Sequence, residues 1–253
     1  MPRLLIAIPV FNERKYVEHV LAKVQQFGDQ ILLVDDGSTD GTAEYLASRS
    51  DIHLIRHPVN RGYGQSLIDA FAWADARGYD WVITMDCDEQ HEPERIPDFL
   101  RAIETDRWDL ISGSRYMQAM TGNDLPPTDR RSINFTITNI LNDMYGPQFG
   151  IPLTDAFCGF KAHRVSATRK LKLDIPGYAF PMQLWPQVAH HKLRVTEIPV
   201  RLIYNDPTRH FGGMLDDATH RLNHYLDVLC AEQRRIDATL LERNQVPCPC
   251  DCV

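Results

Sequence analysis

The chain has 253 residues, of which 43% are hydrophobic, and a formal net charge of -7. This length allows one large α/β domain or two small ones with a sizeable core, and the negative charge argues against a nucleic-acid-binding protein with a basic surface. No apolar run reaches the length of a membrane span, and the short run Leu4 to Val10 contains Pro9, which indicates a first strand and not a signal peptide.

The first half of the chain alternates strand-like and helix-like patterns. Strands are expected at residues 4–8, 31–34, 52–55, 81–85 and 110–111, and helices at 16–24, 40–46, 67–76 and 93–103. Gly78 is expected to end the third of these helices. This alternation predicts an α/β fold with a mostly parallel sheet and helices on both faces.

The second half is less regular. Helical patterns cover residues 131–145, 182–191 and 216–242, and a strand-like run covers 193–203. Pro186 is expected to distort the second helix, and Pro199 indicates an edge strand or a bulge. Because neither a repeat nor a clear linker is visible, we expect a single domain over residues 1–240, followed by a tail at 241–253.

The six cysteines fall into two groups. Cys87, Cys158 and Cys230 are scattered among expected core elements, which favours a reducing compartment and therefore a cytoplasmic location. The other three lie in the Cys- and Pro-containing segment 247–252, which we expect to be a disordered end. A zinc site there is poorly supported, because two separated Cys-x-x-Cys pairs are absent.

Two aspartates separated by one residue follow the expected strand at 81–85. Asp86, Asp88 and the amide oxygen of Gln90 are hard ligands, which suit Mg²⁺ or Mn²⁺ better than zinc. An acidic turn at the end of a strand is the simpler alternative.

Polar or glycine-rich segments follow the other four strands as well. They are residues 9–13, 35–42, 60–64 and 113–115. Ligands of open α/β sheets bind beyond the carboxyl ends of the strands. All five segments are therefore expected to line one crevice.

At these positions the chain resembles the family 2 glycosyltransferases. The motifs that carry the resemblance are Ile-Pro-Val-Phe-Asn-Glu at 8–13, Asp-Asp-Gly-Ser-Thr-Asp-Gly-Thr at 35–42, Asn-Arg-Gly-Tyr-Gly at 60–64 and Asp-Cys-Asp at 86–88. Segments 86–94 and 154–161 look most like dolichol-phosphate mannose synthases and related polyprenyl-phosphate sugar transferases. The resemblance covers roughly residues 4–213.

The resemblance implies a GT-A fold, a donor that is a GDP- or UDP-linked sugar, and Mg²⁺ or Mn²⁺ as cofactor. It implies a nucleotide-binding half at about 1–115 and an acceptor half at about 116–240. The expected reaction is inverting transfer of one hexose to polyprenyl phosphate. We then expect peripheral contact with the cytoplasmic face of a membrane, and a partner protein could supply an anchor.

The residues that the resemblance assigns to the nucleotide sugar follow the first four strands. They are Pro9, Asn12, Glu13, Asp35, Asp36, Gly37, Asp40, Arg61, Gly62 and Asp86. Simpler roles stay open for several of them. Asp35 and Asp36 could only shape a turn, Asn12 and Glu13 could cap the first helix, and glycines also make turns without a ligand.

Asp88, Arg115 and Asp155 are the candidate catalytic residues, and Asp86, Asp88 and Gln90 the candidate metal ligands. A guanidinium such as that of Arg115 binds phosphate oxygens bidentately, although a surface ion pair is the alternative. Asp155 is expected to act as a base or to organise an acceptor pocket beside Lys161 and Arg164.

The candidate acceptor-binding residues are Arg131, Lys161, Gln183, Arg209 and His210. Gln183 stands where many polyprenyl-phosphate transferases carry Glu, and it cannot act as a base. Arg209 and His210 replace a Ser-Lys pair, so any charge on His210 depends on pH.

A phosphate acceptor is already an anion and needs no base, whereas a sugar hydroxyl does. Two alternatives are kept: a soluble or glycan hydroxyl acceptor, and a nucleotide-sugar-binding protein without turnover.

Overall fold

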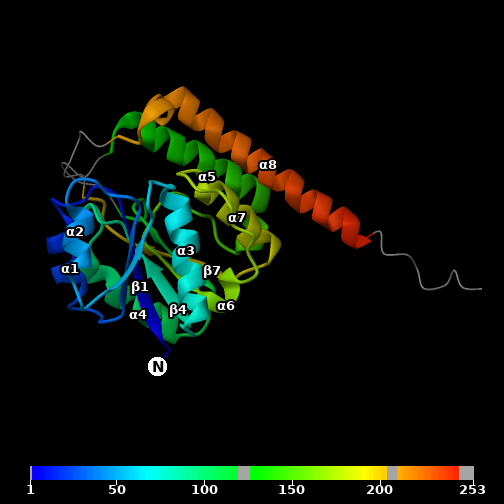
Figure 1. Ribbon diagram of the computed structural model, residues 1–253. Coiled ribbons are helices and arrows are strands. Elements are labelled where there is room, and N and C mark those ends of the chain that lie inside the picture. The colour runs from blue at the N-terminus through cyan, green and yellow to red at the C-terminus, as the bar shows by residue number, and fades with distance from the viewer. Residues whose placement is uncertain (1, 119–125, 204–209, 245–253) are drawn as a thin grey trace, which may run out of the picture.

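The computed structural model describes residues 2–118, 126–203 and 210–244, with side chains described as far as Leu241. Figure 1 shows a layered α/β body from which the last helix extends. Candidate residue Arg209 and most of the predicted tail, from residue 245 on, lie outside the described residues. The strands are β1 Leu4–Val10, β2 Ile31–Asp35, β3 His53–Arg56, β4 Trp81–Thr84, β5 Leu110–Ser114, β6 Lys161–Arg164 and β7 Val195–Pro199.

The helices alternate with the strands in the first half and cluster in the second. They are α1 Val17–Val24, α2 Thr42–Ala47, α3 Tyr63–Ala76, α4 Ile96–Glu104, α5 Thr128–Phe149, α6 Val165–Thr168, α7 Phe180–His190 and α8 Ala218–Asn244. Short 3₁₀ turns η1, Pro93–Arg95, and η3, Gly213–Asp216, precede α4 and α8.

The seven strands form one sheet in the order β3-β2-β1-β4-β6-β5-β7. Neighbouring strands are parallel except at β6, which runs antiparallel to both β4 and β5. The predicted α/β fold with a mostly parallel sheet is therefore confirmed. The sequence did not predict β6, because Lys-Ala-His-Arg shows no strand-like apolar pattern. β7, which ends at Pro199, lies at the edge of the sheet, where a proline is tolerated.

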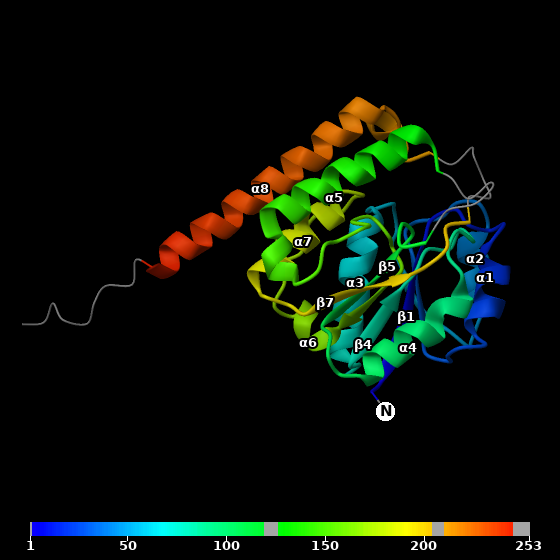
Figure 2. The ribbon, with the colours of Figure 1, turned by 180° about the vertical axis from the view of Figure 1, so that it is seen from behind.

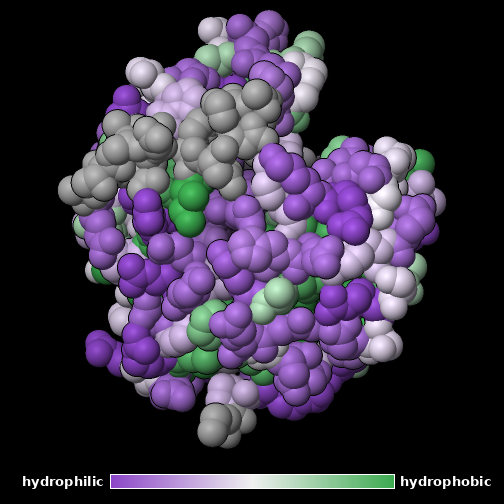
Figure 3. All heavy atoms as spheres, turned by 90° about the vertical axis from the view of Figure 1, so that its left-hand side faces the viewer, coloured by the Kyte–Doolittle hydropathy of each residue, from purple (hydrophilic) through white to green (hydrophobic). Residues whose placement is uncertain are grey.

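Each face of the sheet has its own apolar core. In β1, Leu5 and Ala7 face the core under α3, α5, α7 and α8, whereas Ile6, Ile8 and Val10 face the core under α1, α2 and α4. Figures 1 and 2 show these helices on opposite faces of the sheet. The outer side over α1 and α2 is largely hydrophilic (Figure 3), as expected for surface helices that turn their apolar stripes inward.

Several helices differ from their predicted form, among them α3 and α7, and α6 was not predicted. α3 begins at Tyr63 instead of residue 67, directly after Gly62, which has φ +101°. A Cβ atom at Gly62 would lie 2.4 Å from the Pro176 carbonyl oxygen, so only glycine fits this approach. α7 continues through Pro186, and every residue from Phe180 to Ala189 is buried. We attribute this to tertiary packing, which outweighs the hydrogen bond that proline removes.

α5 and α8 lie side by side over the body, next to α7, and the last turns of α8 extend beyond it (Figures 1 and 2). α8 buries an apolar stripe at Tyr225, Leu229 and Ile236, and the same face also buries Arg221 and Glu232. Within the described ranges, no helix combines the length and the apolar character needed to cross a bilayer.

The buried His163 is expected to make stability sensitive to acid. Burial, together with the nearby Lys161 ammonium, lowers the pKa of His163 from 6.5 to about 3, and its ring packs 4.7 Å from that of Phe71. Between these values the unfolded chain binds the extra proton, so stability falls as the pH falls from 6.5 toward 3. His163→Phe should reduce this slope by up to about 1.4 kcal/mol per pH unit, as measured by urea unfolding between pH 7 and 4.5. Parallel pH profiles for the two proteins would contradict this expectation.

Candidate active site

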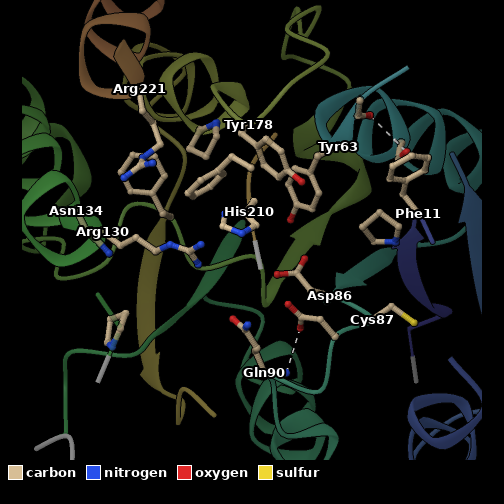
Figure 4. Close-up of a pocket in the computed structure, with 18 of the residues that line it drawn as sticks. Phe11, Tyr63, Asp86, Cys87, Gln90, Arg130, Asn134, Tyr178, His210 and Arg221 are labelled. Atoms are coloured by element: carbon tan, nitrogen blue, oxygen red, sulfur yellow. Dashed lines mark hydrogen bonds between the residues drawn. The ribbon is translucent and has the colours of Figure 1, made fainter. Parts of the chain in front are cut away.

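A cavity of about 410 Å³ lies beyond the carboxyl ends of β1, β2 and β4. It brings together nine of the residues singled out from the sequence: Pro9, Glu13, Asp36, Gly62, Asp86, Asp88, Gln90, Arg115 and His210. Other candidates do not line it: Asn12, Asp35, Gly37, Asp40, Arg61, Arg131, Asp155, Lys161 and Gln183. Figure 4 shows the cavity with Asp86 and Gln90 on one side and Arg130 and Arg221 on another.

Several candidates in the first two loops do not line the cavity, but they fix the shape of the loops that do. Asn12, with φ +56°, donates its backbone N–H to Ser38 Oγ and accepts the Thr39 N–H at 2.8 Å. Asp35 Oδ1 accepts the Ser38 N–H at 3.0 Å, and Asp40 Oδ1 accepts the Thr42 N–H at the start of α2. For Asp35 this is the turn-shaping role that the sequence left open. Asn12 does not cap α1, which the sequence also allowed, and instead joins the β1 loop to the β2 loop.

Asp36 has a different position, because it is buried yet lines the cavity. Its carboxylate accepts the backbone N–H groups of Arg61 and Gly62, both at 2.8 Å, and lies 2.6 Å from His57 Nδ1. The next residue, Gly37, has φ +79°, and a Cβ atom there would lie 2.6 Å from the Val59 carbonyl carbon. Asp36 therefore fixes the segment before α3 to the end of β2.

Asp86 provides the structural observation that bears on a metal ion. Its Oδ1 atom is buried and has no hydrogen-bond partner among the described residues. Burial and the nearby Asp88 raise the pKa of Asp86, although His91 opposes this shift. A bound cation would satisfy this oxygen and favour the ionised carboxylate.

The donor set fits a hard cation with open coordination positions. Asp88 is buried, and its Oδ1 accepts the Gln90 N–H at 3.0 Å. Among the described residues, no group of three or more Asp, Glu, His or Cys side chains is placed to hold a metal ion. Mg²⁺ and Mn²⁺ fit such a site, because Mg²⁺ commonly takes one or two carboxylates and completes its shell with water and phosphate oxygens.

Tyr63 and Gly159 define the space around Asp86. Figure 4 shows the Tyr63 hydroxyl and the Asp86 carboxylate facing each other. Burial, followed by the charge of Asp86, raises the pKa of Tyr63 well above its ordinary value. A Cβ atom at Gly159 would lie 2.8 Å from both Asp86 oxygens and 2.7 Å from the Tyr63 hydroxyl. The position of Asp86 thus depends on Gly159, which lies two residues before β6.

Arg115 is held at the cavity by Asp155. Arg115 Nε and Nη2 donate to the two Asp155 oxygens at 2.6 and 2.8 Å, and Asn134 Nδ2 donates to Asp155 Oδ1 at 2.7 Å. Burial alone would raise the pKa of the Asp155 carboxyl, but the Arg115 guanidinium outweighs it and lowers that pKa to about 2. A carboxylate with so low a pKa and so many partners is a poor base, so Asp155 is better suited to orient Arg115.

The other side of the cavity combines guanidinium groups with aromatic rings. Arg130 and Arg221 lie over the Phe211 ring, at 4.8 and 4.6 Å from its centroid. Tyr178 contacts the same ring edge-on at 5.3 Å and stacks on Tyr63 at 5.8 Å. This half therefore presents guanidinium groups and aromatic rings to the cavity, and Arg221 is paired with Asp129, which does not line it. The carboxylates that do line the cavity lie near β1, β2 and β4.

Four acceptor candidates lie elsewhere or at the margin. Lys161 is buried, with Nζ 2.7 Å from Ser112 Oγ, and Gln183 is buried under α8 with a hydrogen bond to Glu232. Arg131 does not line the cavity, whereas its neighbour Arg130 does. His210 lines it with a largely exposed side chain. Arg164, expected beside Asp155, instead donates to the Trp108 carbonyl.

The structure also adds residues that the sequence did not single out. Phe11 lines the cavity with an exposed fraction of 45%, and Asn134, Arg221 and Tyr225 line its other half. An exposed aromatic residue directly after a buried strand was the available signal for Phe11. The four-residue spacing of Arg221 and Tyr225 on the buried face of α8 was the signal for Arg221.

Comparison with known proteins places these features in context. Residues 5–172 match Glycosyl transferase family 2. The undecaprenyl-phosphate mannosyltransferase of Micrococcus luteus is 29% identical over 229 residues, covering 85% of this chain and 90% of that protein. The polyprenol monophosphomannose synthase of Mycolicibacterium smegmatis is 30% identical over 208 residues, covering 78% of this chain and 76% of that protein.

Solved structures agree on the fold. The mannosyl-3-phosphoglycerate synthase of Rubrobacter xylanophilus has a TM-score of 0.68 and 16% identity, covering 98% of this chain and 78% of that chain. The glucosyl-3-phosphoglycerate synthase of Mycobacterium tuberculosis, in complex with Mn²⁺, UDP and phosphoglyceric acid, has a TM-score of 0.59 and 17% identity, covering 98% and 80%. At these identities the likeness supports a GT-A fold.

Gly159→Ala should displace Asp86 with little effect on the fold, because the atoms that the new methyl group meets are the ends of side chains. We expect Mn²⁺ affinity to fall about 10- to 100-fold, measured by the thermal stabilisation that Mn²⁺ gives. Gly146→Ala is the matched control, because a Cβ atom there meets nothing within 4 Å. Equal Mn²⁺ stabilisation of the original protein and the Gly159 variant would contradict the placement of the metal.

Asp155→Asn should destabilise the protein by leaving the Arg115 charge without its partner. We expect the free energy of unfolding at pH 7 to fall by about 3–5 kcal/mol, whereas Asp143→Asn, on the exposed side of α5, should change it by less than about 0.5 kcal/mol. The folded pKa of about 2 lies below the ordinary 3.8. The stabilisation is therefore complete above pH 3.8 and is lost as the pH falls through about 2. Urea unfolding of the three proteins measures this, and equal stabilities would show that the pair contributes nothing.

Proposed function

The chain belongs to glycosyl transferase family 2, and from this premise we propose that it transfers a hexose from a nucleotide-diphosphate sugar to polyprenyl phosphate. The observation that carries the proposal is the division of the cavity into an acidic half and a cationic, aromatic half. Two relatives that match most of the chain act, by their names, on undecaprenyl phosphate and on polyprenol.

The acidic half suits the donor. Asp86 and Asp88, with Gln90, would hold Mg²⁺ or Mn²⁺, which stabilises the charge that develops on a departing nucleoside diphosphate. Pro9, Glu13, Asp36 and Gly62 line the cavity on this side, and Phe11 offers an aromatic face. Nucleotide and metal positions are thus adjacent, as displacement of a nucleoside diphosphate requires.

Arg115 lies between the two halves. Asp155 takes two of its N–H donors, and a guanidinium has five. The others can bind a phosphate oxygen of the donor or the acceptor. Because Asp155 fixes the guanidinium in advance, Arg115 can stabilise transition-state charge without reorganising.

The cationic half suits an acceptor that joins a phosphate to an apolar chain. Its described lining residues include Arg115, Arg130, Arg221 and His210 but no carboxylate, and apolar groups surround them: Ile133, Phe157, Leu202, Phe211 and Tyr225. A sugar hydroxyl would need a base, and the described residues of this half include no carboxylate that could act as one. A phosphate monoester can attack the anomeric carbon directly, which gives inversion.

The predicted membrane contact fits this arrangement. Phe135 and Met117 are about half exposed, and the Phe135 ring lies 5.1 Å from that of Tyr116, which lines the cavity. Binding to polyprenyl-phosphate vesicles in a cosedimentation assay tests this contact, and protein that stays in the supernatant would argue against it. The cytoplasmic location and the anchoring partner stay predictions.

Removing both metal-binding carboxylates should abolish transfer. With labelled nucleotide sugars, Mn²⁺ and polyprenyl phosphate, we expect a lipid-linked product that chelator removes. Asp86→Ala/Asp88→Ala should lower its formation by at least about a thousandfold, since a metal ion supplies several kcal/mol of charge stabilisation. Asp143→Ala/Asp227→Ala, at exposed positions of α5 and α8, is the matched control.

Each alternative predicts a different outcome of this assay. Transfer to a soluble sugar but not to the lipid would replace the acceptor that we propose. Metal-dependent donor binding without transfer to either acceptor would favour a binding protein. Full activity of the double variant in the presence of chelator would overturn the proposed role of the metal.

A further inference from the structure

We propose that, of the two expected donor nucleotides, UDP is used and GDP is not, because the hydrogen bonds already made by Asp36 disfavour guanine. The inference rests on the proposed function, because it assumes that Asp36, which lines the donor half of the cavity, meets the base. It depends on how many further N–H groups this carboxylate can accept.

The acceptor capacity of Asp36 is nearly filled by the protein itself. Each carboxylate oxygen accepts about two hydrogen bonds. Oδ1 lies 2.6 Å from His57 Nδ1 and accepts the Arg61 N–H at 2.8 Å, whereas Oδ2 accepts only the Gly62 N–H, also at 2.8 Å. One acceptor place therefore remains, and it is on Oδ2.

His57 is held so that it cannot easily release Oδ1. The imidazole is buried, and its Nε2 lies 2.9 Å from Asp69 Oδ2. Both neighbours of the ring are carboxylates, which accept hydrogen bonds, so the imidazole is held between Asp36 and Asp69. Asp69 is itself held by Gln65 at 2.9 Å and by Arg61 at 3.2 Å.

The two other donors to Asp36 are equally fixed. They are backbone N–H groups of Arg61 and Gly62, at the point where the chain enters α3. Gly62 lies so close to Pro176 that the backbone has no room to shift toward it. Neither amide can swing away to make space for a base without losing its own buried hydrogen bond.

The two bases place different demands on this carboxylate. The Watson–Crick edge of uracil offers one N–H donor between two carbonyl groups. Guanine offers two adjacent donors, the ring N–H and the amino group, which pair with a carboxylate through one bond to each oxygen. Because Oδ1 has no place left, one guanine donor would stay unpaired, and an unpaired donor in a buried site weakens binding by roughly 10- to 100-fold.

The test compares the affinities of UDP and GDP in the presence of Mn²⁺, measured by calorimetry on the full chain. We expect UDP to bind at least about tenfold more tightly. His57→Phe removes the ring donor and opens a place on Oδ1, so the preference should shrink by about tenfold, mainly through tighter GDP binding. His57→Asn keeps an N–H donor near the position of Nδ1 and should keep the preference.

His53→Phe is the matched control, because it removes an exposed imidazole from β3, four residues before His57, without touching Asp36. It should leave the ratio of the two affinities unchanged. GDP binding as tight as UDP binding in the original protein would overturn the inference and leave the proposed function standing. An unchanged ratio in the His57→Phe variant would also overturn it. Failure of both nucleotides to bind would overturn the proposed function itself.

Discussion

The buried pair between Arg115 and Asp155 is the interaction on which the cationic half of the cavity depends. Asp155 is fully buried, and its backbone N–H is held by Glu197 of β7 at 3.1 Å. Asn134 of α5 donates to the same carboxylate. One ion pair thus joins the end of β5 to β7 and to α5. A buried carboxylate is tolerated only when its hydrogen-bonding positions are satisfied, and here Asn134 and backbone N–H groups complete those of Asp155.

In the acidic half, the two carboxylates Asp36 and Asp86 differ in how fully the protein satisfies their hydrogen bonds. Asp36 is satisfied by backbone N–H groups and His57, whereas Asp86 keeps a buried oxygen without a partner among the described residues. The first carboxylate stabilises its loop, and the open position on the second is the one that the proposed metal ion would fill. The two carboxylates therefore differ in role: one completes the fold, and the other, in our proposal, is left for a ligand.

The elements of the first half and the location of the site were predictable because their signals are local. Each parallel strand is a short apolar run, and its carboxyl end is marked by glycine or a carboxylate within a few residues. β6 was not predictable, since its strand character comes from pairing with β4 and β5 and not from its own four residues. The difference between Asp36, which lines the cavity, and Asp35, which does not, also escaped the sequence. It depends on partners at residues 57, 61 and 62 that only the fold brings near.

Gln183 shows how a departure from a family pattern can have a structural cause. In the sequence it suggested a lost base and hence a protein without turnover. In the structure its oxygen accepts the N–H groups of Asp174 and Ile175, and its nitrogen donates to the carboxylates of Asp174 at 2.6 Å and Glu232 at 3.2 Å. A glutamate could accept those two N–H groups but could not donate to either carboxylate, and it would place a further negative charge beside the buried Glu232 and the exposed Asp174. The glutamine is thus matched to Glu232 of α8 and lies away from the cavity, so it does not argue against catalysis by this chain.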